Sequence, residues 1–489
     1  MRPYATVFLV ACCYLTAFSP CLAQDQAVVY ESFAVDTAAS PRGGAGMLEA
    51  FLKINLRKPF PAKIAGISGK VYVKAVVEPT GRVSDVTVIR GLRPDCDREA
   101  VRAFGLFSGW APARKAGRAV RQVLTYPVFF EPNQPLNYRN GQLTAYFDQK
   151  NNALPTVAAA RRKQVIPVDS LTGWPTGEMT IVALNGTDET PEGRIPLERI
   201  TLMPKNGDAD TLVALGHRQA NMRWYGPFYK IDKKGNLRAV DNATTGEAVY
   251  YNRQGMVTGA ETSSDGVVSR LTWHPSGLLS QVEKWDKNAP SVPDVNNYRL
   301  MSAWDSTGQP TIQQGNGLFR SVIPARSRGG SGRVVQFLES GTYQNGLKTG
   351  QWQGVYTDSS YLYQETYNAG KPLGGTATIA NKPPLRYRTA EQNPEFDGGP
   401  PAMYRFLSKT ISFPKDAIRN NVGGKVFIAF TVCEDGTLCD YEVRKGVYPS
   451  IDSEALRVVK EMSGKWKPGL YRGEPVRVKY NMPISFDLQ

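Results

Sequence analysis

Alternation of apolar and polar residues near the end of the chain predicts a β-hairpin followed by a helix. Two alternating runs flank an Asp435-Gly436 turn, and apolar residues then recur at helical spacing until Gly464. Asp452 stands where an N-cap residue is expected. The pattern also predicts a short helix over 402–407 and a third extended segment over 475–486. The apolar positions that define the hairpin and its helix are Val426, Ile428, Phe430, Val432, Tyr441, Val443, Ala455, Leu456, Val458, Val459 and Met462.

The same pattern occurs near the start of the chain. Residues 69–73 align with residues 424–428 at an offset of 355, and after one inserted residue Trp110 aligns with Trp466 at an offset of 356. Other matched pairs are Gly81 with Gly436, Asp85 with Asp440, Gly91 with Gly446, Asp97 with Asp452, Ala100 with Ala455, Pro112 with Pro468, Gly117 with Gly473, Val120 with Val476, Pro127 with Pro483 and Phe130 with Phe486. The matches predict a duplicated module over 47–132 and 391–489.

The middle of the chain, about residues 140–380, carries a looser pattern of an aromatic or aliphatic residue, a polar stretch and a glycine. A cleaner pair is Gly341-x-Tyr343-x2-Gly346-x3-Gly350-x-Trp352, echoed by Tyr367-x2-Gly370-x3-Gly374. This region resembles MORN-type variant repeats, in which aromatic rings stack between successive hairpins and glycines permit the turns. We expect these aromatic residues to form the core of the repeat, and a glycan-binding platform is the alternative.

Together these patterns predict the α+β class: two small two-layer domains, each with helices on a short antiparallel sheet, flanking a mostly-β repeat region. The length of 489 residues fits about three domains. A hydrophobic content of 41% is too high for wholesale disorder. The net charge of +15 favours negatively charged neighbours such as anionic lipid or cell-wall acids.

The first 23 residues have the features of a secretory signal peptide. Arg2 precedes an apolar run, and Pro20 and a Cys-Leu-Ala site follow it. Two alternatives stay open, an uncleaved membrane anchor and a lipidated Cys12. Cleavage leaves three cysteines, of which Cys433 and Cys439 flank the predicted hairpin turn. They are predicted to form a cross-strand disulfide or to remain two reduced thiols.

The candidate chemistry does not favour an enzyme. His217 and His274 stand far apart without a cluster of acids or cysteines, so no metal site and no histidine-based triad are predicted. The adjacent acids Glu434 and Asp435 are accounted for by the turn, and no nucleophile elbow or phosphate-binding loop occurs. We therefore expect no catalytic residues, cofactor or metal, and no nucleic-acid partner.

The C-terminal module resembles the C-terminal domain of TonB proteins, and the module over 47–132 resembles it as a divergent copy that keeps the Asp-x2-Ala and Trp-x-Pro elements. The resemblance rests on these motifs: Phe413-Pro414-x2-Ala417, Gly424-Lys425-Val426, Asp435-Gly436, Ile451-Asp452-x2-Ala455, Trp466-x-Pro468-Gly469 and Pro483-x2-Phe486. It implies that an extended receptor segment is bound by strand addition to an exposed sheet edge. The edge we expect to bind is Val476, Arg477, Val478, Lys479 and Tyr480. The alternative is that Arg477 and Lys479 prevent edge pairing.

The chain departs from what the resemblance implies for an energy transducer. Its N-terminal segment has no histidine, and its 34 prolines form no long spacer. We therefore predict a periplasmic or outer-membrane-associated protein that binds outer-membrane receptor segments in TonB-dependent transport, anchored to the inner membrane if the signal is retained. The alternative is a structural or assembly protein of the envelope. A homodimer and binding to anionic lipid or cell wall are further open alternatives.

Overall fold

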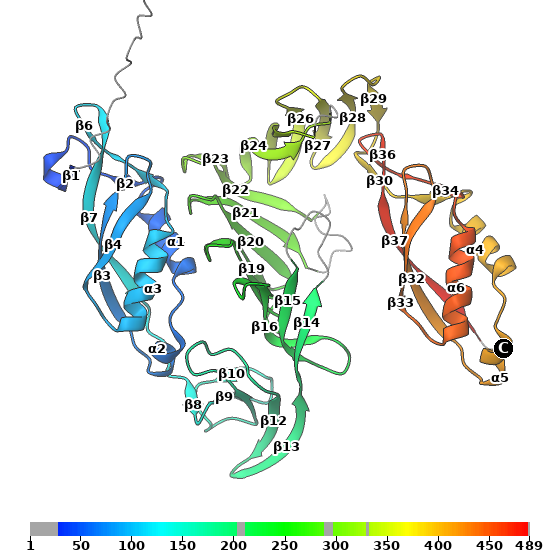
Figure 1. Ribbon diagram of the computed structural model, residues 1–489, viewed down its shortest axis with the longest axis horizontal. Helices are drawn as coiled ribbons and strands as arrows, with labels where there is room; N and C mark the ends of the chain where they lie inside the picture. The colour runs from blue at the N-terminus through cyan, green and yellow to red at the C-terminus, as the bar shows by residue number, and fades with distance from the viewer. Residues whose placement is uncertain (1–27, 203–210, 288–296, 329–331, 488–489) are drawn as a thin grey trace, which may run out of the picture.

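The computed structural model describes residues 28–202, 211–287, 297–328 and 332–487. The predicted signal segment, residues 1–23, lies outside the described residues. Along the chain, helices and sheets form an N-terminal module, a central β region and a C-terminal module (Figure 1). Among the described residues, no helix is long and apolar enough to cross a membrane.

The N-terminal module is a five-stranded sheet whose main order is β1-β7-β3-β4, with β6 also pairing with β7. Strand β3 places alternate apolar side chains, among them Val71 and Val73, in a core shared with helices α1 and α3. The bounds are β1 (Val29–Tyr30), β2 (Ser40–Pro41), α1 (Ala45–Asn55), α2 (Phe60–Ile64), β3 (Gly69–Val77), β4 (Val83–Arg90), α3 (Pro94–Gly105), β5 (Trp110–Ala111), β6 (Ala113–Lys115) and β7 (Arg118–Phe130), with a 3₁₀ turn at Ser32–Ala34.

The C-terminal module places its elements in the same order, and its main sheet runs β33-β32-β37. Val426, Ile428 and Phe430 of β32 are fully buried against helix α6. The bounds are β30 (Glu391–Gln392), β31 (Glu395–Phe396), α4 (Gly399–Thr410), α5 (Lys415–Arg419), β32 (Gly424–Val432), β33 (Leu438–Lys445), α6 (Pro449–Glu461), β34 (Trp466–Lys467), β35 (Gly469–Tyr471), β36 (Glu474–Val476) and β37 (Val478–Phe486).

The aspartate predicted to cap the second helix has a different role. Helix α6 begins at Pro449 after the N-cap residue Tyr448, so Asp452 lies within the first turn. Its carboxylate accepts a hydrogen bond from the Val447 backbone N–H at 2.8 Å. Asp97 of α3 accepts the equivalent bond from the Leu92 N–H at 2.8 Å. Each aspartate therefore fixes the chain that enters its helix, a contact that helical periodicity does not reveal.

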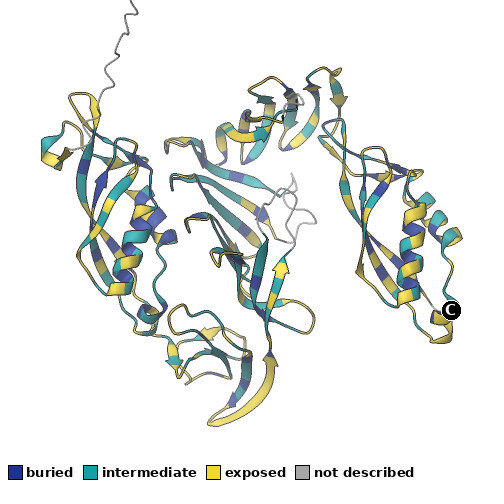
Figure 2. Ribbon diagram, viewed as in Figure 1, coloured by how far each residue is buried: buried dark blue, intermediate teal, exposed yellow. Residues whose placement is uncertain are grey.

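In the central region, the regular elements among the described residues are all strands. A six-stranded sheet contains β8 (Asn137–Arg139), β9 (Gln142–Phe147), β10 (Ala153–Leu154), β11 (Arg162–Pro167), β12 (Met179–Asn185) and β13 (Asp188–Ile195). Strand β13 is almost wholly exposed (Figure 2). The long sheet then pairs sixteen strands in sequence order: β14 (Leu197–Leu202), β15 (Leu212–Arg218), β16 (Trp224–Asp232), β17 (Leu237–Asn242), β18 (Glu247–Tyr251), β19 (Val257–Ser264), β20 (Val267–Trp273), β21 (Leu279–Asp286), β22 (Arg299–Trp304), β23 (Pro310–Gln313), β24 (Asn316–Arg326), β25 (Val334–Gln344), β26 (Leu347–Tyr356), β27 (Tyr361–Asn368), β28 (Lys371–Ile379) and β29 (Leu385–Tyr387).

The predicted fold class, α+β with two helix-on-sheet domains flanking a repeat region, is wrong. The described residues are mostly β, with 52% in strands and 14% in helices, and large sheets in a propeller-like arrangement dominate them. The prediction gave most weight to the two end patterns, where helical spacing is clear. It underestimated the middle, where short antiparallel strands continue one sheet from β14 to β29. The aromatic residues of the repeat, such as Trp352 and Tyr363, are buried in small cores along this sheet.

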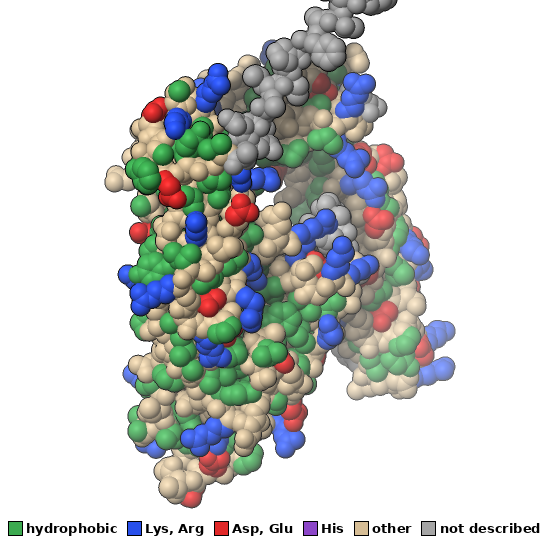
Figure 3. Space-filling view, turned by 60° about the vertical axis from the view of Figure 1, so that its left-hand side comes forward, with side chains coloured by type: hydrophobic (Ala, Val, Ile, Leu, Met, Phe, Trp, Pro, Cys, Tyr) green, Lys and Arg blue, Asp and Glu red, His purple; other side chains and the backbone are tan. Residues whose placement is uncertain are grey.

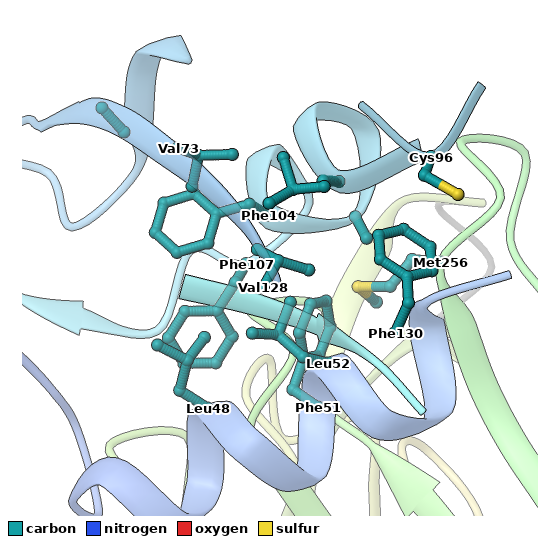
Figure 4. Close-up of a cluster of buried hydrophobic side chains, with 14 of the residues drawn as sticks. Leu48, Phe51, Leu52, Val73, Cys96, Phe104, Phe107, Val128, Phe130 and Met256 are labelled. Carbon is teal, nitrogen blue, oxygen red and sulfur yellow. The ribbon is translucent and has the colours of Figure 1, made fainter. Parts of the chain in front are cut away.

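The long sheet contacts both modules. Met256 and Leu278, at turns of the sheet, belong to the same buried cluster as Phe51 of α1, and Figure 4 shows Met256 beside Phe130. The Asn55 side chain accepts a hydrogen bond from the Val257 N–H at 2.7 Å. At the other end, Arg472 of the C-terminal module forms an ion pair with Glu365 of β27.

Candidate strand-binding edge

The predicted binding segment, residues 476–480, spans the start of the edge strand β37. Val476 ends β36 and pairs with Gly469, whereas Arg477 lies between the two strands. Val478, Lys479 and Tyr480 belong to β37, which pairs with β32 on one side. In the described chain, no strand pairs with the other side of β37. The backbone of this segment is therefore open to an additional strand.

The charged side chains of this edge lie over the sheet. The Arg477 guanidinium is 2.8 Å from a carboxylate oxygen of Asp440, and the Lys479 ammonium is 3.9 Å from Glu442. Both acids belong to β33, on the far side of β32. These pairs are half exposed, so each contributes little to stability. They nevertheless direct the two cations across the sheet face rather than out from its edge.

Tyr480 has a mainly structural role. Its ring stacks on Phe430 with centroids 5.5 Å apart and meets Trp466 edge-on at 5.0 Å. Such contacts stabilise a core beyond the area that they bury. Tyr480 therefore anchors β37 to the module, and its backbone rather than its ring is what an added strand would meet.

The two hairpin cysteines lie beside this edge. Cys433 and Cys439 are joined as a disulfide across the turn between β32 and β33. The Arg477 guanidinium contacts the Cys439 sulfur at 3.2 Å. The remaining described cysteine, Cys96, is buried in the N-terminal core, where burial raises the pKa of its thiol to about 11. It is therefore a protonated core side chain at neutral pH.

In the N-terminal module the equivalent edge is covered by the chain itself. Strand β1 adds to β7 in parallel, with Val29 opposite Arg121 and Tyr30 opposite Gln122. The Lys115 ammonium lies 4.2 Å from the centre of the Tyr30 ring. The sequence pattern does not reveal this strand, because two residues are too few to show any periodicity. Arg121 aligns with Arg477 at the offset of 356, so β1 occupies the position that is open in the C-terminal module.

The chain takes a different path at the corresponding point of the C-terminal module. From β31 onward the two paths agree, because Pro41 pairs with Trp110 and Phe396 pairs with Trp466. The residue 355 positions after Tyr30 is Leu385, which begins β29. Strand β29 pairs with β28 of the long sheet rather than with β37. The segment that would cover the C-terminal edge is thus held elsewhere.

The residues weighed for catalysis are held by hydrogen bonds to backbone carbonyls elsewhere in the chain or within a turn. His217 and His274 each place Nε2 within hydrogen-bond distance of a backbone carbonyl oxygen, at 3.1 and 2.9 Å. Asp435 accepts hydrogen bonds from the side chain and N–H of Thr437, and these lower the pKa of its carboxyl. Within the described residues, no group of three or more His, Cys, Asp or Glu is arranged to hold a metal.

Comparison with known proteins identifies the two end modules. The family model described as "Gram-negative bacterial TonB protein C-terminal" matches residues 58–132 and 409–488. Two solution structures of the Helicobacter pylori TonB C-terminal domain are similar to part of this chain, with 24% and 23% identity. Each covers 18% of this chain, over 78% and 89% of its own length, with a TM-score of 0.15. No curated protein matches the chain.

The family implies a periplasmic or envelope location, and domains of this kind are not enzymes. The resemblance of the central region to MORN-type repeats stays a prediction. The match at both ends agrees with the motifs around Trp466 that suggested the resemblance and with the alignment of Trp110 to Trp466. Residues 58–132 and 409–488 of this chain each match the model of the TonB C-terminal family.

Proposed function

We propose that this chain is a cell-envelope binding protein whose C-terminal module captures an extended segment of an outer-membrane receptor. The segment adds as a strand beside residues 477–480, and the chain acts in TonB-dependent transport. Proteins of the family generally interact with outer-membrane receptors. Strand addition supplies affinity through backbone hydrogen bonds and selects partners through alternate side chains.

The observation that carries the proposal is the contrast between the two edges. In the N-terminal module, β1 already pairs with Arg121 and Gln122. The matching positions Arg477 and Val478 have no such strand among the described residues. The same edge geometry therefore accepts a short apolar segment, Val29–Tyr30, within this molecule. By analogy, a receptor segment would run parallel to β37 and place an apolar or aromatic residue opposite Val478.

Amide hydrogen exchange of the full chain tests the proposal. A peptide from the N-terminal segment of an outer-membrane receptor of the host should slow exchange at residues 477–480, and a scrambled peptide should not. Residues 121 and 122 are an internal control, because β1 already covers them. Receptor peptides that leave residues 477–480 unprotected would contradict the proposal. Protection that instead grows with protein concentration would indicate an edge used for assembly of the chain with itself.

A further inference from the structure

Six consecutive strands, β24 to β29, each place one residue in a single row across one face of the long sheet. Adjacent members of the row are direct register partners from strand to strand. At about 4.8 Å per strand, the row is roughly 24 Å long. Its members, in order, are Arg320, Ser340, Gln353, Gln364, Thr376 and Arg386. We call it the polar row: neutral hydrogen-bonding side chains between two terminal arginines.

The face around the polar row is hollowed and partly apolar. One hollow of about 360 Å³ is lined by Ser340, Gln353 and Gln364, and another of about 560 Å³ by Gln364, Thr376 and Arg386. A parallel row on the same face is apolar, with Val322 opposite Leu338 and Val355 opposite Leu362. Val322 is 60% exposed. The face thus offers amides and hydroxyls beside a strip of aliphatic side chains.

The charge on this face has one sign. The described outward positions of β24 to β29 include Arg320, Arg326 and Arg386 but no aspartate or glutamate. The two acids of these strands, Glu339 and Glu365, point to the opposite side, where they pair with Lys348 and Arg472. A cationic face with no acid at the outward positions of its strands attracts anionic ligands. Arginine also binds carboxylates and phosphates through two parallel hydrogen bonds.

The neutral part of the face distinguishes between anionic ligands. Contact with a lipid bilayer would remove water from the row of glutamine, serine and threonine side chains without replacing their hydrogen bonds, which is costly. A saccharide supplies a hydroxyl for each of these groups and an apolar ring face for the aliphatic strip. The strand spacing is similar to the length of one sugar unit, so a linear chain can meet one row residue per unit.

We propose that the outer face of β24–β29 binds an anionic polysaccharide, which lies across the strands along the polar row. Arg320 and Arg386 pair with acidic groups near the two ends of the bound stretch. Gln353, Gln364 and their neighbours hydrogen-bond its hydroxyls. This site is separate from the strand-binding edge and goes beyond the function proposed above.

Titration calorimetry of the full chain with polygalacturonate fragments tests this site, because that polymer is linear and carries one carboxylate per sugar. The double variant Arg320→Gln, Arg386→Gln should weaken binding about tenfold or more. The matched control Arg98→Gln, Arg419→Gln removes two exposed arginines elsewhere and has the same net charge, so it should bind as the unmodified chain does. Gln364→Glu places an acid at the centre of the row and should weaken binding without changing the circular dichroism spectrum.

Several outcomes would overturn the site. The site is overturned if the polymer does not bind the unmodified chain. It is also overturned if the control variant weakens binding as much as the row variant, because net charge alone would then be responsible. If neutral dextran bound as tightly as polygalacturonate, the arginines would have no role in binding. Binding to phosphatidylglycerol vesicles, lost in the row variant, without binding to polygalacturonate would assign the face to a lipid surface instead.

Discussion

At the scale of single residues, two glycines hold equivalent turns against the carbonyl of a tryptophan. Gly436 has φ +79°, and a Cβ added there would lie 2.1 Å from the Trp466 oxygen. Gly81 has φ +82°, and its Cβ would lie 2.5 Å from the Trp110 oxygen. The sequence identifies the glycine through the turn, but the carbonyl above it comes from a segment about thirty residues away. Both the positive φ and the close approach therefore require glycine.

We expect Gly436→Ala to lower the free energy of unfolding of the C-terminal module by about 2–4 kcal/mol, because it combines a left-handed backbone with a clash against backbone. Gly464 is the matched control: its φ is +76°, but a Cβ there meets nothing within 4 Å. Gly464→Ala should cost only about 1 kcal/mol. Urea unfolding of both variants measures the difference. Equal losses would show that the Trp466 carbonyl moves aside and that backbone conformation alone decides the cost.

At the scale of elements, the pattern of apolar residues locates the paired strands but not the strand that covers an edge. Alternation places both strands of the hairpin correctly: β32 buries one face, whereas in β33 only Leu438 is buried. It cannot show that β1 pairs with β7, since the partners are about ninety residues apart. Nor can it show that β29 joins the long sheet, because β29 pairs with the edge of β28 rather than with the edge of β37, and only the tertiary structure decides between these two edges. The open edge is thus a consequence of topology.

Removing β1 tests this competition directly. Deletion of residues 28–31 should expose the β7 edge, so that exchange at Arg121 and Gln122 becomes faster, because their partners Val29 and Tyr30 are gone. A peptide carrying the sequence of β1 should then bind and restore the protection. Exchange at Arg477 and Val478 serves as the control and should not change in the deletion variant. Unchanged protection at Arg121 and Gln122 after the deletion would mean that β1 does not cover that edge in solution.

At the scale of the whole molecule, different chemistry joins the long sheet to each module. The N-terminal contact combines an apolar cluster, in which Leu278 is fully buried, with hydrogen bonds such as the one from the Val257 N–H to Asn55. Lys and Arg side chains lie scattered over the face shown in Figure 3, and no single basic patch stands out there. The C-terminal contact is ionic: Glu365 is fully buried, and the Arg472 guanidinium is 2.8 Å from it and 3.3 Å from the centre of the Tyr363 ring. No sequence pattern pairs residues 107 positions apart, so neither contact was predicted.

The ionic contact predicts that the position of the C-terminal module depends on pH. Burial raises the pKa of Glu365, but hydrogen bonds and charge from Arg472 outweigh burial, and the pKa ends below its ordinary value. Because the pKa of Glu365 is lowered in the folded protein, the contact is stabilised at pH values above the ordinary glutamate pKa of about 4.3. This stabilisation is lost as the pH falls through the lowered pKa. Tyr367 and Tyr387, which also face Glu365, have pKa values raised by burial and do not titrate in this range.

We therefore expect the C-terminal module to separate from the long sheet below about pH 4, measured as an increase in the radius of gyration by small-angle X-ray scattering. Arg472→Ala should produce the same separation at neutral pH and destabilise the contact by about 3–5 kcal/mol, because it leaves a buried carboxylate without its partner. Arg444→Ala is the control, since the pair between Arg444 and Glu442 is half exposed and should cost less than about 1 kcal/mol. A radius that stays constant in Arg472→Ala at neutral pH would show that the apolar contacts around Tyr363 hold the module without the ion pair.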